Sequence, residues 1–191
     1  QVGLRYTATG SSQRNDMFIS PYPGEILGGI PHMGLRVILE LARSVGRLSL
    51  DSADYKDNPI LEYRYLEDSW DLERMREGTR LAIQLASTPP LEGLFESWTD
   101  PVLEDVKSED ALDDWILRNV ATPHHSSGTC KMGPSSDPLA VVNQYGCVHG
   151  MQGLRVIDAS IMPDVIRANT NATSVMIGER MAEWVKRGVT S

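Results

Sequence analysis

The sequence is poor in features that define several common classes of protein. Among its 191 residues it has two cysteines, Cys130 and Cys147, which are too few for a disulfide framework, and neither has the CxxC partner typical of zinc sites. We expect reduced packing cysteines, with a single disulfide as the alternative. No apolar run approaches the roughly 18 residues that cross a bilayer. No basic, apolar leader is present either, so we expect a cytoplasmic protein.

Positive charge is also scarce. Lysine and arginine together number 18 against 26 acidic residues, which gives a formal net charge of −8. This balance argues against a general nucleic-acid binder and gives no reason to expect an anionic membrane as partner. A hydrophobic content of 41% suits one globular domain or a piece of a larger one. The opening QVGLRYTATG is typical of a strand already under way, so we expect the chain to begin within a fold.

The first 60 residues favour short strands. LRYTA, DMFIS, HMGLRVILELA and GRLSLDS are the candidate strands, and SPYPGEILGGIP between them is predicted as a loop because of its Gly and Pro content. A short extended piece follows within DYKDNPILEYRYLEDS. Because no helical pattern separates these strands, we predict an antiparallel sheet.

Three helices are predicted after the strands. The first spans Ser69–Thr88 with Ser69 as N-cap and Asp71 complementing the helix dipole, and Ser108 caps a second that runs to Val120. GLRVIDAS is predicted as a strand covered on both faces, and ATSVMIGERMAEWVKRG as a helix with Gly188 as C-cap. The fold class is therefore α+β, closing on a strand–loop–helix unit of α/β type.

The stretch TPHHSSGTCKMG places two adjacent histidines, His124 and His125, before a Gly-Thr-Cys turn. Either imidazole could act as a general base near neutral pH. Solvated or capping histidines are the plain alternative. Zinc binding is disfavoured, because adjacent residues rarely converge on one tetrahedral ion. A serine nucleophile at Ser126 or Ser127 is disfavoured too, because no G-x-S-x-G elbow is present.

A second polar cluster, RANTNATS, precedes the last predicted helix. Asn169 and Asn171 could simply cap this helix, since asparagine is a favoured cap. A helix N-terminus also attracts negatively charged groups of a ligand. The residues alone leave both interpretations open.

From Thr122 to Lys186, HHSSGTCKMG followed by VHGMQGLRVIDASIMPDVIRANTNATSVMIGERMA closely resembles the C-terminal signature of the glucose–methanol–choline (GMC) flavoprotein oxidoreductases. Upstream, RYTATGSSQRNDMFIS and GRLSLDSADYKDNPILEYRYLEDSWDLERMREGTRLA are similar to the family's substrate-domain strands and following helix. The resemblance implies that residues 1–120 are part of a substrate-binding domain. It implies that residues 121–191 hold the catalytic His loop and return to an FAD-binding, Rossmann-like domain as its last strand and helix.

The resemblance also implies roles for single residues. The family's catalytic His lies three residues before the Gly of Gly-Thr, which makes His125 the base and leaves His124 to line the pocket at most. The second catalytic position, eleven residues after the Asp of DAS, falls on Asn169. This places the chain with the His/Asn members. The implied FAD contacts are Asp158, Ala159, Thr170, Asn171 and Thr173, where the family often carries Pro in place of Thr170.

The implied reaction is FAD-dependent oxidation of an alcohol to an aldehyde or ketone. His125 takes the hydroxyl proton while hydride passes to flavin N5, and Asn169 binds the substrate oxygen. No G-x-G-x-x-G is found in the sequence. We therefore expect a partner chain or N-terminal segment to carry that motif, in a homo- or hetero-oligomer if the partner is separate. The alternatives are a hydroxynitrile-lyase-type relative and a non-catalytic subunit.

Overall fold

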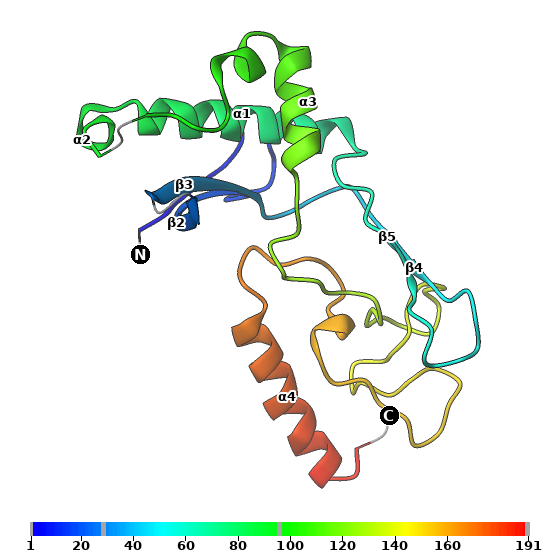
Figure 1. Cartoon of the computed structure of the whole chain (residues 1–191). Coiled ribbons are helices and arrows are strands. Elements are labelled where there is room, and N and C mark those ends of the chain that lie inside the picture. The colour runs from blue at the N-terminus through cyan, green and yellow to red at the C-terminus, as the bar shows by residue number, and fades with distance from the viewer. Residues whose placement is uncertain (1, 28–29, 95–96, 190–191) are drawn as a thin grey trace. The chain divides into compact units, whose positions relative to one another are not determined.

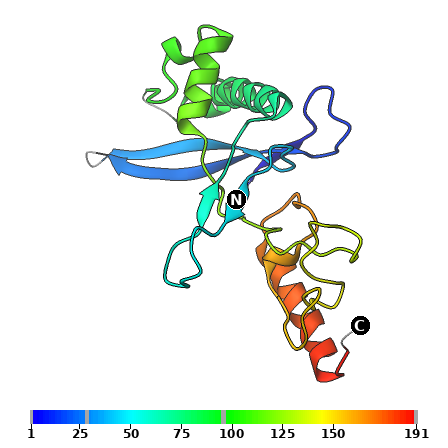
Figure 2. The same ribbon diagram turned by 90° about the vertical axis from the view of Figure 1, so that its right-hand side faces the viewer.

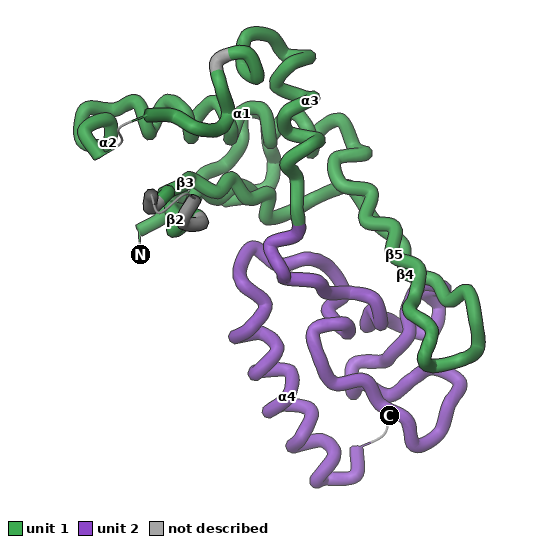
Figure 3. Tube along the Cα trace, in the orientation of Figure 1, with its two compact units in different colours: residues 1–121 green, residues 122–191 purple. Residues whose placement is uncertain are grey.

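The computed structural model describes residues 2–27, 30–94 and 97–189. The chain divides into two compact units, residues 1–121 and residues 122–191 (Figure 3). The assignment of the first to substrate binding and of the second to catalysis and FAD stays a prediction. The fold class is α+β, as predicted, with antiparallel sheets in the first unit.

The main sheet of the first unit has three antiparallel strands in the order β1 (Leu4–Tyr6), β2 (Met17–Leu27) and β3 (Ile30–Leu39) (Figure 1). Met17 and Ile19 are almost fully buried, whereas Phe18 between them is partly exposed. This alternation is the two-residue period of a strand with one covered face. A second, two-stranded sheet pairs β4 (Arg47–Ser49) with β5 (Ile60–Glu62).

The loop predicted for residues 20–31 is wrong. Most of it belongs to β2 and β3, with a register irregularity between Pro23 and Ile26. The Asp16 carbonyl accepts a hydrogen bond from the Glu40 N–H at 2.9 Å, so these two residues form a hydrogen-bonded pair. Hydrogen-bonded and non-hydrogen-bonded pairs alternate along antiparallel strands, and counting along β2 places Pro21 and Pro23 at non-hydrogen-bonded pairs with β3. Their nitrogens face the other edge of β2, where β1 no longer runs. Two prolines two residues apart therefore fit this strand.

Helix α1 (Ser69–Ala86) packs on this sheet, and Gly78 lies at their closest approach. A Cβ at Gly78 would come within 2.5 Å of the Val37 side chain and 3.0 Å of Met17. The N-cap is Asp68, whose carboxylate accepts a hydrogen bond from the Trp70 N–H at 2.9 Å. Ser69, the predicted cap, is instead the first helical residue. A charged cap at Asp68 also complements the positive end of the helix dipole.

Helix α3 (Glu109–Asn119) packs against α1, and Figure 2 shows both on the same side of the main sheet. Its predicted N-cap is confirmed, because Ser108 Oγ accepts a hydrogen bond from the Ala111 N–H at 3.2 Å. Arg76 joins the helices through a two-pronged ion pair with Asp113, at 2.5 and 2.6 Å. Two short helices, α2 (Pro89–Glu92) and η1 (Leu103–Val106), lie in the connection.

A buried ion-pair cluster fastens α1 to the sheet. Arg74, 1% exposed, donates to Asp16 at 2.9 Å and to Asp71 at 2.6 Å, and both carboxylates are fully buried. Burial alone would raise the pKa of each carboxyl, but hydrogen bonds hold both pKa values below the ordinary range. They come from Ser11 and Arg74 to Asp16, and from Ser44 and Arg74 to Asp71. Asp71, the acidic residue predicted in the first turn of α1, is thus also a buried partner of Arg74.

In the described part of the second unit, residues 122–189, the chain forms the long helix α4 (Asn171–Lys186), the short helix η2 (Ala159–Ile161) and irregular backbone. Its core consists of five buried apolar side chains: Val142, Ile161, Met162, Ile177 and Met181. The C-cap of α4 is Arg187, and the predicted cap Gly188 follows it in the left-handed conformation, with φ +66°. A left-handed glycine just beyond a helix is a common terminator.

The strand predicted at GLRVIDAS is not formed. Cys147 and Arg155 make one isolated antiparallel bridge, the Val156 N–H donates to the Gly146 carbonyl at 2.9 Å, and the chain then enters η2. An apolar run becomes a strand only where neighbours continue the ladder on its edges. Within the residues that the structure describes, no such continuous neighbour lies beside it.

No helix in the described part of the chain is long and apolar enough to cross a membrane. The compartment expected from the sequence stays a prediction.

Candidate active site

The predicted catalytic loop, residues 122–133, has no regular secondary structure. His124 forms a bend in the left-handed conformation, with φ +64°, and its N–H donates to Thr122 Oγ1 at 3.0 Å. The His124 side chain is exposed, whereas His125 is partly buried. The more sheltered imidazole is therefore that of His125, the residue predicted to be the base.

A series of backbone hydrogen bonds holds this loop against the predicted cofactor segment. The N–H groups of Gly128, Cys130 and Met132 donate to three successive carbonyls of η2, those of Ala159, Ser160 and Ile161, at 3.3, 2.9 and 2.9 Å. We call these three bonds the η2 ladder. Gly128 has φ +83°, a conformation that suits glycine. The ladder brings the His125 loop and the DAS segment side by side.

Asp158 organises the start of η2. Its Oδ1 accepts a hydrogen bond from the Ser160 N–H at 2.8 Å, which makes it the N-cap. The side chain is otherwise exposed. Asp158, predicted as an FAD contact, thus already has a local structural role through one carboxylate oxygen.

The remaining predicted residues lie at the start of α4. Thr170 is the N-cap residue but makes no side-chain capping bond, and Asn171 is the first helical residue. Asn169 and Asn171 are exposed, and Thr173 is partly buried. Ile177 of α4 belongs to the same buried cluster as Ile161 of η2, so this helix and η2 share one core.

Among the residues described, the imidazole of His125 and the amide of Asn169 make no hydrogen bond to each other. No group of three or more His, Cys, Asp or Glu side chains suited to a metal ion converges within those same residues.

The loop that follows the histidines is braced by polar contacts. Lys131 donates to Asp137 at 2.8 Å, and this hydrogen bond, with one from the Leu139 N–H, lowers the pKa of the Asp137 carboxyl. His149 Nε2 donates to the Gly133 carbonyl at 3.0 Å, because a carbonyl oxygen can only accept. These contacts hold the part of the loop that follows His124 and His125 in the chain.

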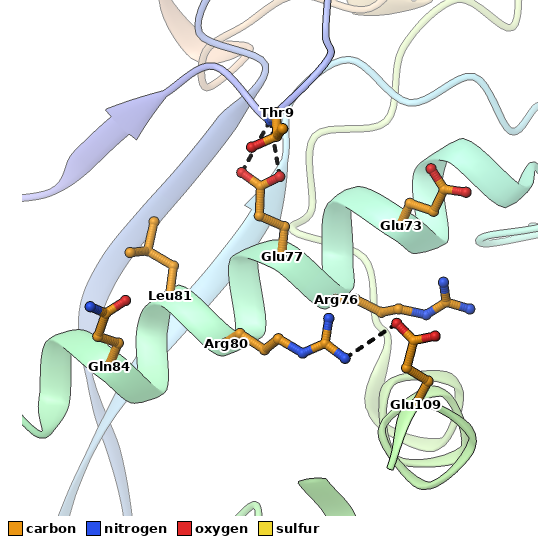
Figure 4. A pocket seen from close by; sticks show the side chains of 8 residues that line it. All are labelled: Thr9, Glu73, Arg76, Glu77, Arg80, Leu81, Gln84 and Glu109. Carbon is orange, nitrogen blue, oxygen red and sulfur yellow. Dashed lines mark hydrogen bonds and ion pairs between the residues drawn. The ribbon is translucent and has the colours of Figure 1, made fainter.

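A charged surface groove of about 510 Å³ lies in the first unit, but it holds none of the predicted site residues (Figure 4). Glu77 accepts two hydrogen bonds from the Thr9 N–H, at 3.2 and 2.9 Å, and Arg80 pairs with Glu109 at 3.4 Å. Its main charges therefore already have partners within the chain. No sequence pattern indicates this groove, because Thr9, α1 and the start of α3 come together only in the fold.

The loop, the DAS segment and the start of α4 are thus arranged around one small core. The sequence model of the GMC oxidoreductases matches residues 42–178, which include most of these segments. The chain belongs to the GMC oxidoreductase family. Members of this family are FAD-dependent flavoproteins.

Curated relatives support the assignment. The GMC chain is 38% identical over 144 residues to the oxygen-dependent choline dehydrogenase of Pectobacterium atrosepticum, covering 75% of this chain and 25% of that protein. It is 41% identical over 150 residues to the glucose dehydrogenase (FAD, quinone) of Drosophila pseudoobscura pseudoobscura, covering 76% and 24%. The chain thus spans about a quarter of the length of these relatives.

Solved structures agree on the fold. The crystal structure of pyridoxine 4-oxidase from Mesorbium loti matches with a TM-score of 0.80 at 25% identity, covering 95% of this chain and 37% of that one. The fold expected from the resemblance is therefore confirmed for nearly the whole GMC chain.

The residues around α4 and η2 fit part of a flavin site. Because Thr170 makes no capping bond, no cap side chain covers the first amides of α4, and an uncapped helix start favours a negatively charged group. The exposed carboxylate of Asp158 has a second oxygen that could accept from a ligand hydroxyl. The sequence lacks the glycine-rich dinucleotide motif, so these residues fit one side of FAD and not a complete site.

Proposed function

We propose that this chain supplies the catalytic half of an FAD-dependent oxidoreductase that converts an alcohol to an aldehyde or ketone. The observation that carries the proposal is the η2 ladder. It places the loop of the predicted base, His125, against the segment of the predicted FAD contacts, in a chain of the GMC family. The choline and glucose dehydrogenases among its relatives are named for substrates that carry hydroxyl groups.

His125 acts as the general base in this proposal. An alcohol is a poor hydride donor until its O–H proton is removed, and a neutral imidazole can accept that proton. Bound FAD supplies the acceptor for the hydride. His125 is partly buried and its loop is fixed by backbone bonds on the C-terminal side, so the imidazole is restrained without being sealed from substrate.

Asn169 orients the substrate. Its exposed amide can donate a hydrogen bond to the substrate oxygen while His125 removes the proton from the same oxygen. Holding this oxygen from two sides fixes the direction in which the adjacent C–H bond points. His124, exposed on the preceding residue, lines the pocket.

In this proposal five residues hold the cofactor: Asp158, Ala159, Thr170, Asn171 and Thr173. They lie at the starts of η2 and α4, and no capping side chain covers the first N–H groups of α4. A partner chain or N-terminal segment with the glycine-rich motif provides the rest of the FAD site, and the substrate is a small alcohol.

The test replaces the base. In the flavin-loaded enzyme that contains this chain, His125→Gln should lower kcat by about 10²-fold or more, because general-base assistance is typically worth 10²–10⁴-fold. Flavin content should not change. Loss of the yellow flavin absorbance on anaerobic addition of alcohol measures the step, and His32→Gln on β3 is the control, with normal activity expected.

Two results would contradict the proposal. Full activity in His125→Gln would remove His125 as the base and favour a non-catalytic subunit. A flavin that stays oxidised while a hydroxynitrile is cleaved would instead identify a lyase.

A further inference from the structure

The turn before His125 is held by one side chain. Thr122 Oγ1 accepts the hydrogen bond of the His124 N–H at 3.0 Å, and this bond closes a short turn across Pro123. His124 is one of four non-glycine residues with positive φ among those that the structure describes. A residue with a Cβ rarely adopts this conformation unless its surroundings hold it there.

The turn sets the direction in which the chain enters His125. The ring of Pro123 restricts its own φ, and the Thr122 hydroxyl fixes the next N–H group. With φ of His124 at +64°, the chain bends immediately before the base.

The C-terminal side of His125 is held in a different way. The η2 ladder begins at Gly128, three residues after the base. His125 thus lies between two anchors, the Thr122 turn and the η2 ladder. The Thr122 turn depends on one hydroxyl group, so it can be removed by a single substitution that leaves the ladder intact.

We propose that Thr122 is a positioning residue for His125. Its hydroxyl holds His124 in the left-handed turn, and the turn aims the imidazole of His125 at the reacting oxygen. This inference rests on the proposed function of His125. Thr122 itself touches neither substrate nor cofactor in it.

The test compares Thr122→Val, which keeps the shape and removes the hydrogen-bond acceptor, with Thr122→Ser, which keeps the acceptor. In the flavin-loaded enzyme that contains this chain, Thr122→Val should lower kcat about 10-fold or more with KM for the alcohol within about threefold, because misorientation by a fraction of an ångström slows transfer more than binding. The α-deuterium isotope effect on kcat should rise. Thr122→Ser should stay within about threefold of the parent.

A control variant tests whether losing any partly buried threonine hydrogen bond would slow the enzyme to the same extent. Thr88 is partly buried like Thr122, and its hydroxyl also bonds a backbone group, the Leu85 carbonyl, at 2.6 Å. Thr88→Val removes a comparable bond in the first unit and should leave kcat and the isotope effect unchanged. Equal losses in Thr88→Val and Thr122→Val would overturn the proposal.

A second measurement does not depend on activity. With histidine labelled by ¹³C and ¹⁵N, the Cα and Cβ shifts of His124 report its backbone conformation. They should leave left-handed values in Thr122→Val and keep them in Thr122→Ser. Unchanged shifts in Thr122→Val would overturn the proposal.

The outcomes separate this inference from the function on which it rests. If His125→Gln is inactive while Thr122→Val has normal kcat, the positioning role is wrong and the base assignment stands. If His125→Gln is fully active, the proposed function fails. The shifts of His124 then still decide whether Thr122 holds the turn.

Discussion

Different kinds of interaction stabilise the interior of each of the two units. In the first, α1 and the sheet are joined by side-chain charges, above all Arg74 between the buried Asp16 and Asp71. In the second, loops are joined by backbone hydrogen bonds such as the η2 ladder, around a core of five apolar side chains.

This difference suits the roles that we propose. Backbone hydrogen bonds fix a loop without using its side chains, so the imidazole of His125 and the second carboxylate oxygen of Asp158 stay available for the substrate and cofactor of the proposed function. The first unit has no such constraint and uses specific side chains in its interior. Substitutions that remove a charge should therefore lower the stability of the first unit most. Substitutions that disturb the backbone conformation should lower that of the second unit most.

The largest effect is expected for Arg74→Met. Removing the guanidinium leaves two buried carboxylates without their cation. Breaking a buried ion pair in this way typically lowers the free energy of unfolding by about 3–5 kcal/mol. Urea unfolding followed by circular dichroism measures it. Arg80→Met is the control. Arg80 forms an exposed pair with Glu109, and its loss should cost less than about 1 kcal/mol.

The same cluster has a defined pH dependence. Because the folded-state pKa values of Asp16 and Asp71 are depressed, their stabilising contribution is present above the ordinary Asp pKa and is lost as pH falls through the lower folded values. The loss of stability caused by Arg74→Met should become smaller in acid, because protonation of Asp16 and Asp71 removes the buried negative charge. A penalty that stays constant down to strongly acidic pH would contradict this account.

A smaller effect is expected for a backbone change in the second unit. Gly146 and Gly150 have similar φ values, +72° and +75°, but an added Cβ would lie 2.8 Å from the Val156 carbonyl at Gly146 and meet nothing within 4 Å at Gly150. Gly150→Ala should cost about 1 kcal/mol from conformation alone. Gly146→Ala should cost about 1–3 kcal/mol more from overpacking. Equal melting temperatures of the two variants would show that the close approach is unimportant.

The smallest effect concerns Tyr6, whose hydroxyl is buried and has no hydrogen-bond partner among the residues that the structure describes. Tyr6→Phe should stabilise the protein at neutral pH by about 1 kcal/mol or less, because an unsatisfied polar group is removed. Thermal unfolding checks this. A destabilised Phe variant would indicate that the hydroxyl is satisfied by water.

The raised pKa of Tyr6 also predicts that the folded state loses stability in alkaline solution. Burial, and then the charges of Glu77 and Asp16, raise its pKa from 10.0 to about 12. Between these values the folded state keeps a proton that the unfolded state has lost, so stability should fall as pH rises from about 10 to 12. Tyr6→Phe should reduce this slope.

The sequence predicted the elements whose signals are local. The helices at Ser69–Ala86 and Glu109–Asn119 follow from their periodicity and flanking caps, and only the cap choice between Asp68 and Ser69 was wrong. The failures depend on neighbours far along the chain. Composition at residues 20–31 indicated a loop because it does not reveal that Pro21 and Pro23 lie at non-hydrogen-bonded pairs with β3.

The candidate site was predicted through motifs rather than geometry. Spacing and family resemblance selected His125 and Asn169 together with the segments around them. They did not reveal that the η2 ladder joins two of those segments. Thr122 was missed because a threonine before Pro-His is unremarkable, and its role depends on the positive φ of His124.

The two prolines of β2 have a further consequence for how the protein behaves at high concentration. At Pro21 and Pro23 the edge of the strand that faces away from β3 has no N–H to offer. A neighbouring molecule could not extend the sheet there with a continuous ladder, because donors are missing at alternate positions. The proline-bearing edge of β2 is thereby protected against edge-to-edge aggregation.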